Sequence, residues 1–234
     1  MRVAVVQPFT VPADLAANIA EHERLLRIAE ADLCVFPELS LTGLEFEALA
    51  ADPGLWLTVD DARLGPLRAA CRASGVHAVI GLPLVEDGRR HIGTLVLGPD
   101  GETVATYAKR NLHDSEDELF EPGGRQVVVE VGGRRLGLAI CLDAANPDHS
   151  RELAEAGADV YVVSALFSEG QEQRLLDQVG VAAGRGMWVV LAQYSGETGG
   201  MAAFGGSGVW KPGGAAEVRL GGEVSEWAYA TITS

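Results

Sequence analysis

Short apolar runs along this chain alternate with longer segments in which apolar positions recur at helical spacing. Residues 2–7 and 32–38 are apolar runs, and residues 15–31 between them show the helical pattern. Asp14 stands directly before the helical segment and is expected to cap its amino end. Strand, helix and strand in this order predict a βαβ unit.

The remaining pattern predicts one mixed α/β domain over residues 1–234. We expect further strands over residues 77–83, 92–97, 102–107, 126–131, 134–140, 159–164, 188–192, 208–210 and 227–232. We expect further helices over residues 64–74, 150–156 and 171–183. The turn signals at residues 99–101 and 132–133 join neighbouring strands antiparallel, whereas helical connections join parallel ones. No linker, low-complexity tract or short-period repeat interrupts the chain.

The most informative apolar run is residues 135–143, RLGLAICLD. An apolar run without alternation is typical of a strand that is buried on both faces. Such a strand delivers its last side chain to the carboxyl edge of the sheet, where α/β proteins bind their ligands. Cys141 is therefore a candidate nucleophile, although a cysteine among apolar residues is more often an inert core residue.

Three charged residues in or near loops that follow predicted strands could complete a site around this thiol. Glu38 follows a strand and a proline, Lys109 follows the strand at 102–107, and Glu116 lies in the acidic segment 114–118. For each of them the ordinary alternative is a solvated surface charge. Together, however, they supply the groups that acyl transfer from a thiol requires.

A thiol needs a base, and Glu38 could take its proton and return it to a leaving amine. The oxyanion that forms needs positive charge or N–H donors, which Lys109 and the backbone N–H of Leu142 could provide. A cysteine–histidine pair is the weaker reading, because none of the five histidines follows a strand in a pattern that commits it to the thiol. His149 is the best placed of them.

Composition narrows the function classes. The 234 residues carry a net charge of −15, which disfavours binding to nucleic acid or to anionic membrane surfaces. Three widely separated cysteines suggest neither a disulfide framework nor a zinc site, and we expect a reducing, cytoplasmic environment. The apolar segment at the amino terminus is expected to be a strand, since it is too short for a secretory signal.

Three segments resemble, in order, the signature motifs of the nitrilase (carbon–nitrogen hydrolase) superfamily. They are residues 36–43 (FPELSLTG), 107–112 (YAKRNL) and 137–143 (GLAICLD). Residues 116–123 (EDELFEPG), 151–159 and 204–207 are also similar to family segments, so the likeness runs nearly the whole length of the chain.

The resemblance implies a four-layer αββα sandwich with two mixed β-sheets and a cysteine–glutamate–lysine triad. By motif position, Cys141 is the nucleophile, Glu38 the general base and acid, Lys109 the oxyanion stabiliser, and Glu116 a second acid that orients the site. It also implies hydrolysis of an amide or nitrile through a thioester, no metal or organic cofactor, a small-molecule substrate, and a homodimer or larger homo-oligomer.

Departures from the family pattern bear on the substrate. Asn111 stands where the family often has histidine, and Ala145 where many amidase-like members have arginine. Because Ala144 and Ala145 offer no charge to a substrate carboxylate, the resemblance favours a small uncharged or cationic amide. Leu142-Asp143 is more similar to the amidase branches than to true nitrilases. The remaining hypotheses are a nitrilase and a catalytically silent scaffold member.

We expect the acyl pocket to be lined by Leu142 and by the segment after the strand at 159–164. That segment comprises Ala165, Leu166 and Phe167, and the loop near Tyr194 should lie beside it. These residues are mostly apolar and predict a narrow apolar cavity, with ordinary core packing as the alternative.

Overall fold

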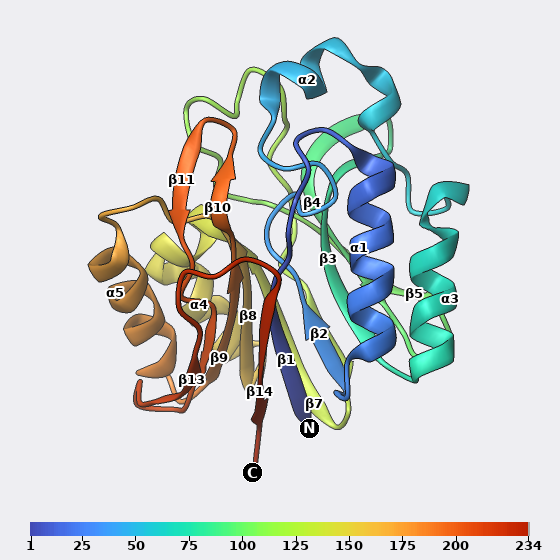
Figure 1. The fold of residues 1–234 in the computed structure, drawn as a ribbon. Coiled ribbons are helices and arrows are strands. Elements are labelled where there is room, and N and C mark those ends of the chain that lie inside the picture. Colours follow the sequence, from blue (N-terminus) through green and yellow to red (C-terminus); the bar gives the residue numbers. More distant parts are fainter. Residues whose placement is uncertain (234) are drawn as a thin grey trace.

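Two six-stranded sheets lie face to face in the computed structural model, and helices cover the outer face of each sheet (Figure 1). The structure describes residues 1–233. The first sheet has the strand order β14-β1-β2-β3-β4-β5, and the second has the order β13-β12-β9-β8-β7-β6. Helices α1 and α3 cover the first sheet, and α4 and α5 cover the second (Figure 1). The predicted αββα sandwich is therefore confirmed.

The helices are α1 (Leu15–Ile28), α2 (Phe46–Ala51), α3 (Gly65–Ser74), α4 (Pro147–Glu155) and α5 (Glu172–Ala183). Short 3-10 helices cover Pro53–Leu55, Ala62–Leu64 and Cys141–Ala145. The strands of the first sheet are β1 (Arg2–Gln7), β2 (Leu33–Val35), β3 (His77–Glu86), β4 (Arg89–Leu97), β5 (Thr103–Ala108) and β14 (Glu226–Thr231). Those of the second are β6 (Val128–Val131), β7 (Arg134–Ile140), β8 (Val160–Ala165), β9 (Trp188–Gln193), β12 (Gly208–Trp210) and β13 (Ala216–Arg219). A separate hairpin comprises β10 (Ser195–Thr198) and β11 (Met201–Phe204).

Each sheet is parallel at its centre and antiparallel towards its edges. Strands β1, β2 and β3 are parallel, as are β7, β8 and β9. Strand β5 is antiparallel to β4, which is antiparallel to β3, so β5 runs in the same direction as β2 and β3. The carboxyl ends of β2 and β5 therefore lie at one edge of the first sheet.

Alternation along single strands divides the apolar core into two layers. Val160 and Val162 of β8 belong to the large cluster that includes the space between the sheets. Tyr161 and Val163 belong to the cluster between the second sheet and helices α4 and α5. A strand that buries both faces in this way has no polar side, which explains the unbroken apolar runs in the sequence.

Several boundaries differ from the predicted ones for local reasons. The strands expected at 77–83 and 92–97 extend to a tight turn at Asp87 and Gly88, both of which have positive φ. Helix α4 begins at Pro147 rather than at residue 150, because the Asn146 side chain accepts a hydrogen bond from the Asp148 N–H and proline suits the first helical position.

Two elements that matter for the site lie outside the predicted set. Helix α2 has only six residues, too few to establish a helical period. The β10–β11 hairpin turns at Gly199 and Gly200, both with positive φ, and this Gly-Gly pair is the signal that could have identified it. Within residues 1–233, no helix has the length and apolar character needed to span a bilayer.

Candidate active site

Glu38 is held just beyond the carboxyl end of β2. The Phe36 N–H donates to Val79 O (2.9 Å), and Ser164 Oγ of the opposite sheet donates to Phe36 O (2.8 Å). Gly81 of β3 lies against the same segment so closely that an added Cβ would come within 2.2 Å of Pro37 O. Glycine at this position allows the Glu38 segment to approach the strand, and sequence reasoning gave Gly81 no role.

Lys109 directly follows β5, and its backbone is fixed on both sides. Its N–H donates to Ile92 O (2.9 Å), and its carbonyl accepts from the Gly123 N–H (2.7 Å). The side chain is 1% exposed, so the ammonium is almost completely removed from water. A buried ammonium requires compensating negative charge.

Two carboxylates supply that charge. Lys109 Nζ donates to Glu38 Oε1 at 2.7 Å and to Glu116 Oε1 at 2.7 Å. Glu116 is itself oriented by the His113 N–H, which donates to its Oε2 (2.8 Å). Burial disfavours the ammonium, but the negative charges of Glu38 and Glu116 outweigh burial and raise the pKa of Lys109. Lys109 therefore carries its positive charge at neutral pH.

Cys141 follows β7 and adopts an unusual backbone conformation. Its φ is +44°, in the left-handed region that non-glycine residues seldom occupy. The Sγ atom lies 3.7 Å from Leu166 O. Burial raises the pKa of the Cys141 thiol to about 12, and the negative charge of Glu38 acts in the same direction. At neutral pH the resting group is therefore a thiol that needs a base.

Glu38 has the properties of that base. Burial raises the pKa of Glu38 above its usual range, although the charge of Lys109 opposes the shift. Its Oε1 is bonded to Lys109, whereas the buried Oε2 has no hydrogen-bond partner among residues 1–233. Glu38 and Cys141 are close enough to influence each other's pKa. One carboxylate oxygen is thus available for a proton from the thiol.

These groups line one small cavity of about 190 Å³. Known ligand pockets usually measure roughly 300–1,000 Å³, so this cavity suits a small molecule. Its walls come from segments that are far apart in the sequence. The lining residues are Glu38, Leu44, Phe46, Lys109, His113, Ser115, Glu116, Cys141, Leu142, Leu166, Ser168, Gln171, Arg174 and Met201.

The predicted pocket residues divide between this cavity and the core. Leu142 and Leu166 line the cavity. Ala165 and Phe167 are not among its lining residues, and both pack in the apolar cluster between the second sheet and helices α4 and α5. Tyr194 is also outside the cavity lining and is buried in the large core cluster.

Sequence reasoning missed several cavity residues. Phe46 comes from α2 and Met201 from β11, two elements that were not predicted. Gln171 and Arg174 lie at the amino-terminal end of α5, and their spacing of three places them on one side of this helix. That spacing is a signal in the sequence, but it does not indicate which side faces the thiol.

His149 is not a partner of the thiol. Its Nε2 lies 2.9 Å from the Tyr107 hydroxyl and its Nδ1 lies 3.0 Å from the Tyr161 hydroxyl. Burial lowers the pKa of His149, so the ring is neutral at pH 7. Among residues 1–233, no three His, Cys, Asp or Glu side chains are grouped in a way that would hold a metal ion.

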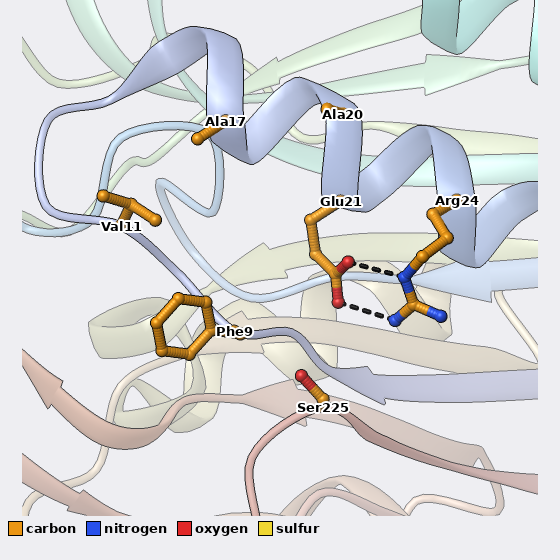
Figure 2. Close-up of a pocket in the computed structure, with 7 residues that line it drawn as sticks. All are labelled: Phe9, Val11, Ala17, Ala20, Glu21, Arg24 and Ser225. Atoms are coloured by element: carbon orange, nitrogen blue, oxygen red, sulfur yellow. Dashed lines mark hydrogen bonds and ion pairs between the residues drawn. The ribbon is translucent and has the colours of Figure 1, made fainter.

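A second hollow lies between α1 and the segment that follows β1 (Figure 2). Its charged side chains, Glu21 and Arg24, are bonded to each other at 2.7 and 2.8 Å (Figure 2). Phe9, Val11 and Ser225 face this hollow from the opposite side. With its charges paired and no thiol present, this hollow lacks the chemistry found around Cys141.

Comparison with known proteins agrees with the geometry. The sequence model of the family described as carbon-nitrogen hydrolase matches residues 2–234. The chain belongs to the carbon–nitrogen hydrolase family. It is 33% identical over 166 residues to an (R)-stereoselective amidase of a Pseudomonas species, covering 70% of this chain and 60% of that protein. It is 30% identical over 165 residues to a nitrilase of Pyrococcus abyssi, covering 68% of this chain and 63% of that protein.

Solved structures extend the likeness to the whole fold. A variant of the amidase from Nesterenkonia sp. AN1 in complex with acrylamide superposes with a TM-score of 0.90 at 27% identity, covering 100% of this chain and 90% of that chain. Another variant of the same amidase carries the acetamide moiety of fluoroacetamide, covalently added at its active-site cysteine. By contrast, this chain spans about 60% of the length of the curated relatives described above.

Proposed function

We propose that this protein is an amidase that hydrolyses the C–N bond of a small amide through a thioester on Cys141. The observation that carries the proposal is the convergence of three groups at one cavity of about 190 Å³. These groups are a thiol, a buried ammonium, and a carboxylate of which one oxygen has no hydrogen-bond partner within the described residues. Membership of the carbon–nitrogen hydrolase family and amidase relatives support the same reaction.

Acylation would begin with the transfer of the thiol proton to Glu38 Oε2. The sulfur attacks the amide carbon, and the carbonyl oxygen becomes an oxyanion. Lys109 Nζ stabilises this charge, together with the N–H of Leu142, which has no intrahelical acceptor near the start of its 3-10 helix. The C–N bond then breaks, and Glu38 returns the proton to the departing ammonia or amine.

Deacylation would use the same groups, with Glu38 again accepting a proton first and then giving it up. A water molecule enters the space left by the amine and gives a proton to Glu38 as its oxygen attacks the thioester carbon. The second tetrahedral intermediate collapses to a carboxylic acid, and the proton returns to sulfur. Glu116 takes no proton in this scheme; it holds Lys109 in place and balances its charge.

The test measures the hydrolysis of a set of small primary amides by the ammonia that is released. The Cys141→Ala variant should lose measurable turnover while its thermal unfolding remains cooperative. Cys71→Ala is a matched control, because Cys71 is also a free thiol but is buried away from the cavity. Intact-protein mass spectrometry should detect an acyl adduct on wild type and none on Cys141→Ala. Unchanged hydrolysis by Cys141→Ala would refute the proposal.

A nitrilase activity is the second candidate, because a nitrilase is among the relatives. Both reactions share the sulfur nucleophile and the thioester, so the triad does not separate them. Rates on propionamide and propionitrile at equal concentration would do so. We expect the amide to be the faster substrate, and a faster reaction of the nitrile would reverse the assignment.

A further inference from the structure

The carboxylate of Asp143 is completely buried and accepts five hydrogen bonds. Its Oδ1 accepts from Arg110 N (3.1 Å), Asn111 N (2.9 Å) and Asn111 Nδ2 (2.8 Å). Its Oδ2 accepts from the Tyr107 hydroxyl (2.6 Å) and Ile140 N (3.0 Å). A carboxylate offers about four lone-pair sites, so both oxygens are fully used.

The donors belong to the two segments that carry the nucleophile and the ammonium. Arg110 and Asn111 directly follow Lys109, at the end of β5 in the first sheet. Ile140 directly precedes Cys141, at the end of β7 in the second sheet. Asp143 therefore connects the ends of two strands that no backbone ladder joins. Its bonds to backbone N–H groups fix the main chain on either side of the site.

Asp143 also stabilises the strained turn at Cys141. A non-glycine residue in the left-handed region costs about 1–2 kcal/mol, so the surrounding structure must hold it there. The Asp143 carboxylate bonds the Ile140 N–H on one side of the turn. The Asp143 carbonyl accepts from the Asn146 N–H on the other side (3.2 Å).

A series of buried, hydrogen-bonded side chains orients the Asp143 carboxylate. The Tyr107 hydroxyl donates to Asp143, so its oxygen is free to accept from His149 Nε2–H. His149 Nδ1 then accepts from the Tyr161 hydroxyl. Every group in this series has a partner when His149 is neutral, which agrees with the lowered pKa of that ring.

We propose that Asp143 is a positioning residue that holds Cys141 and Lys109 in their catalytic arrangement across the two sheets. The proposal rests on the proposed function, because it assumes that these two residues do the chemistry. Asp143 lies outside the cavity lining and reaches the substrate only through its neighbours.

The central experiment compares Asp143→Asn with wild type. An asparagine side chain must turn its NH₂ group towards one of the two sets of donors. Because the backbone N–H groups in that set cannot act as acceptors, their hydrogen bonds to residue 143 are lost. We expect kcat to fall about 100-fold, the loss that a displacement of about 1 Å can cause. KM should change less than about 3-fold, because Asp143 is not a lining residue and the substitution removes no side chain from the cavity wall. All rates are compared at a temperature well below the melting midpoint of each variant.

Asp159→Asn is the matched control. Asp159 accepts from the backbone N–H of Arg135 (2.8 Å) and from Arg134 Nη1 (3.1 Å), at the opposite end of β7 from Cys141. This variant should lose stability without losing kcat. If Asp143→Asn fails to fold, the combined Tyr107→Phe and Asn111→Ala variant removes two donors and leaves the carboxylate in place; we expect about a 10-fold loss of kcat.

A second readout separates this proposal from the proposed function. The rate at which iodoacetamide alkylates Cys141 measures the presentation of the thiol and requires no amide substrate. We expect Asp143→Asn to change this rate at least 5-fold and Asp159→Asn to leave it unchanged. If folded Asp143→Asn kept both the kcat and the alkylation rate of wild type, the positioning role would be overturned. If Cys141→Ala kept its turnover while the alkylation rates still differed, the proposed function alone would fail.

Discussion

Lys109 Nζ donates a 2.7 Å hydrogen bond to Glu38 Oε1, and the two side chains are buried almost completely. Such a pair is costly to separate, because removing one partner leaves an uncompensated charge in a medium that cannot solvate it. The pair also divides the two oxygens of Glu38 between separate tasks. One oxygen binds the ammonium, and the other has no hydrogen-bond partner in the part of the chain that the structure describes.

The first prediction concerns this pair. Lys109→Met should abolish turnover and lower the free energy of unfolding by about 3–5 kcal/mol, because two carboxylates lose their buried cation. Chemical denaturation followed by circular dichroism measures the loss. Adding Glu38→Gln and Glu116→Gln to Lys109→Met should restore much of the stability but none of the activity. If Lys109→Met alone were as stable as wild type, the buried charges would be compensated elsewhere.

The second prediction is the pH dependence of kcat/KM. Glu38 must be deprotonated to accept the thiol proton, so the rate should rise with pH through the pKa of Glu38. Burial raises that pKa, and the acidic limb should therefore lie above the ordinary glutamate value of about 4.3. Steady-state rates from pH 4 to 8 measure it, with unfolding checked at each pH. An acidic limb at or below the ordinary value would contradict the raised pKa of Glu38.

The third prediction concerns Gly81. An added Cβ would lie 2.2 Å from Pro37 O and 2.5 Å from Leu39 N, so Gly81→Ala must push the Glu38 segment away from β3. We expect kcat to fall at least 10-fold, since small displacements of a catalytic group are costly. Gly180→Ala is the matched control, because an added Cβ in α5 meets no atom within 4 Å. Equal activity of the two variants would remove the proposed role of Gly81.

The fourth prediction concerns the charge of the substrate. Ala144 and Ala145 offer no charge to a substrate, yet Arg174 of α5 is one of the residues that line the cavity. Its neighbour Glu172 pairs with Arg219, and no ion pair of Arg174 is found in residues 1–233. We therefore expect kcat/KM to be higher for the monoamide of a dicarboxylic acid than for a neutral amide of equal length.

Arg174→Gln should reduce that preference about 3- to 10-fold, and added salt should reduce it further, because the arginine is exposed. Arg24→Gln serves as the control, since Arg24 is also exposed but faces the hollow beside α1. A preference for the neutral amide in wild type would instead support the substrate class expected from the sequence.

The candidate site was predictable where its residues end strands. Cys141 and Glu38 follow apolar runs, and Lys109 follows a strand that is marked by the turn signal at residues 99–101, so short-range pattern alone assigns them to strand ends. The family motifs then group them, and the structure brings the three together with Glu116 at one cavity. The hydrogen bonds of Asp143 were not predictable, because four of its five donors belong to residues 107–111, which meet residue 143 only in the folded chain.

The sequence by itself determined most of the order of strands and helices, because the periodicity of apolar residues is a local property. Helix α2 and strands β10, β11 and β13 lay outside that prediction. Tertiary structure decided the size and lining of the cavity. Phe46, Met201 and Arg174 reach it from a six-residue helix, a glycine-turned hairpin and one side of α5. Their positions depend on packing between distant segments, and no window of the sequence contains both partners of such a contact.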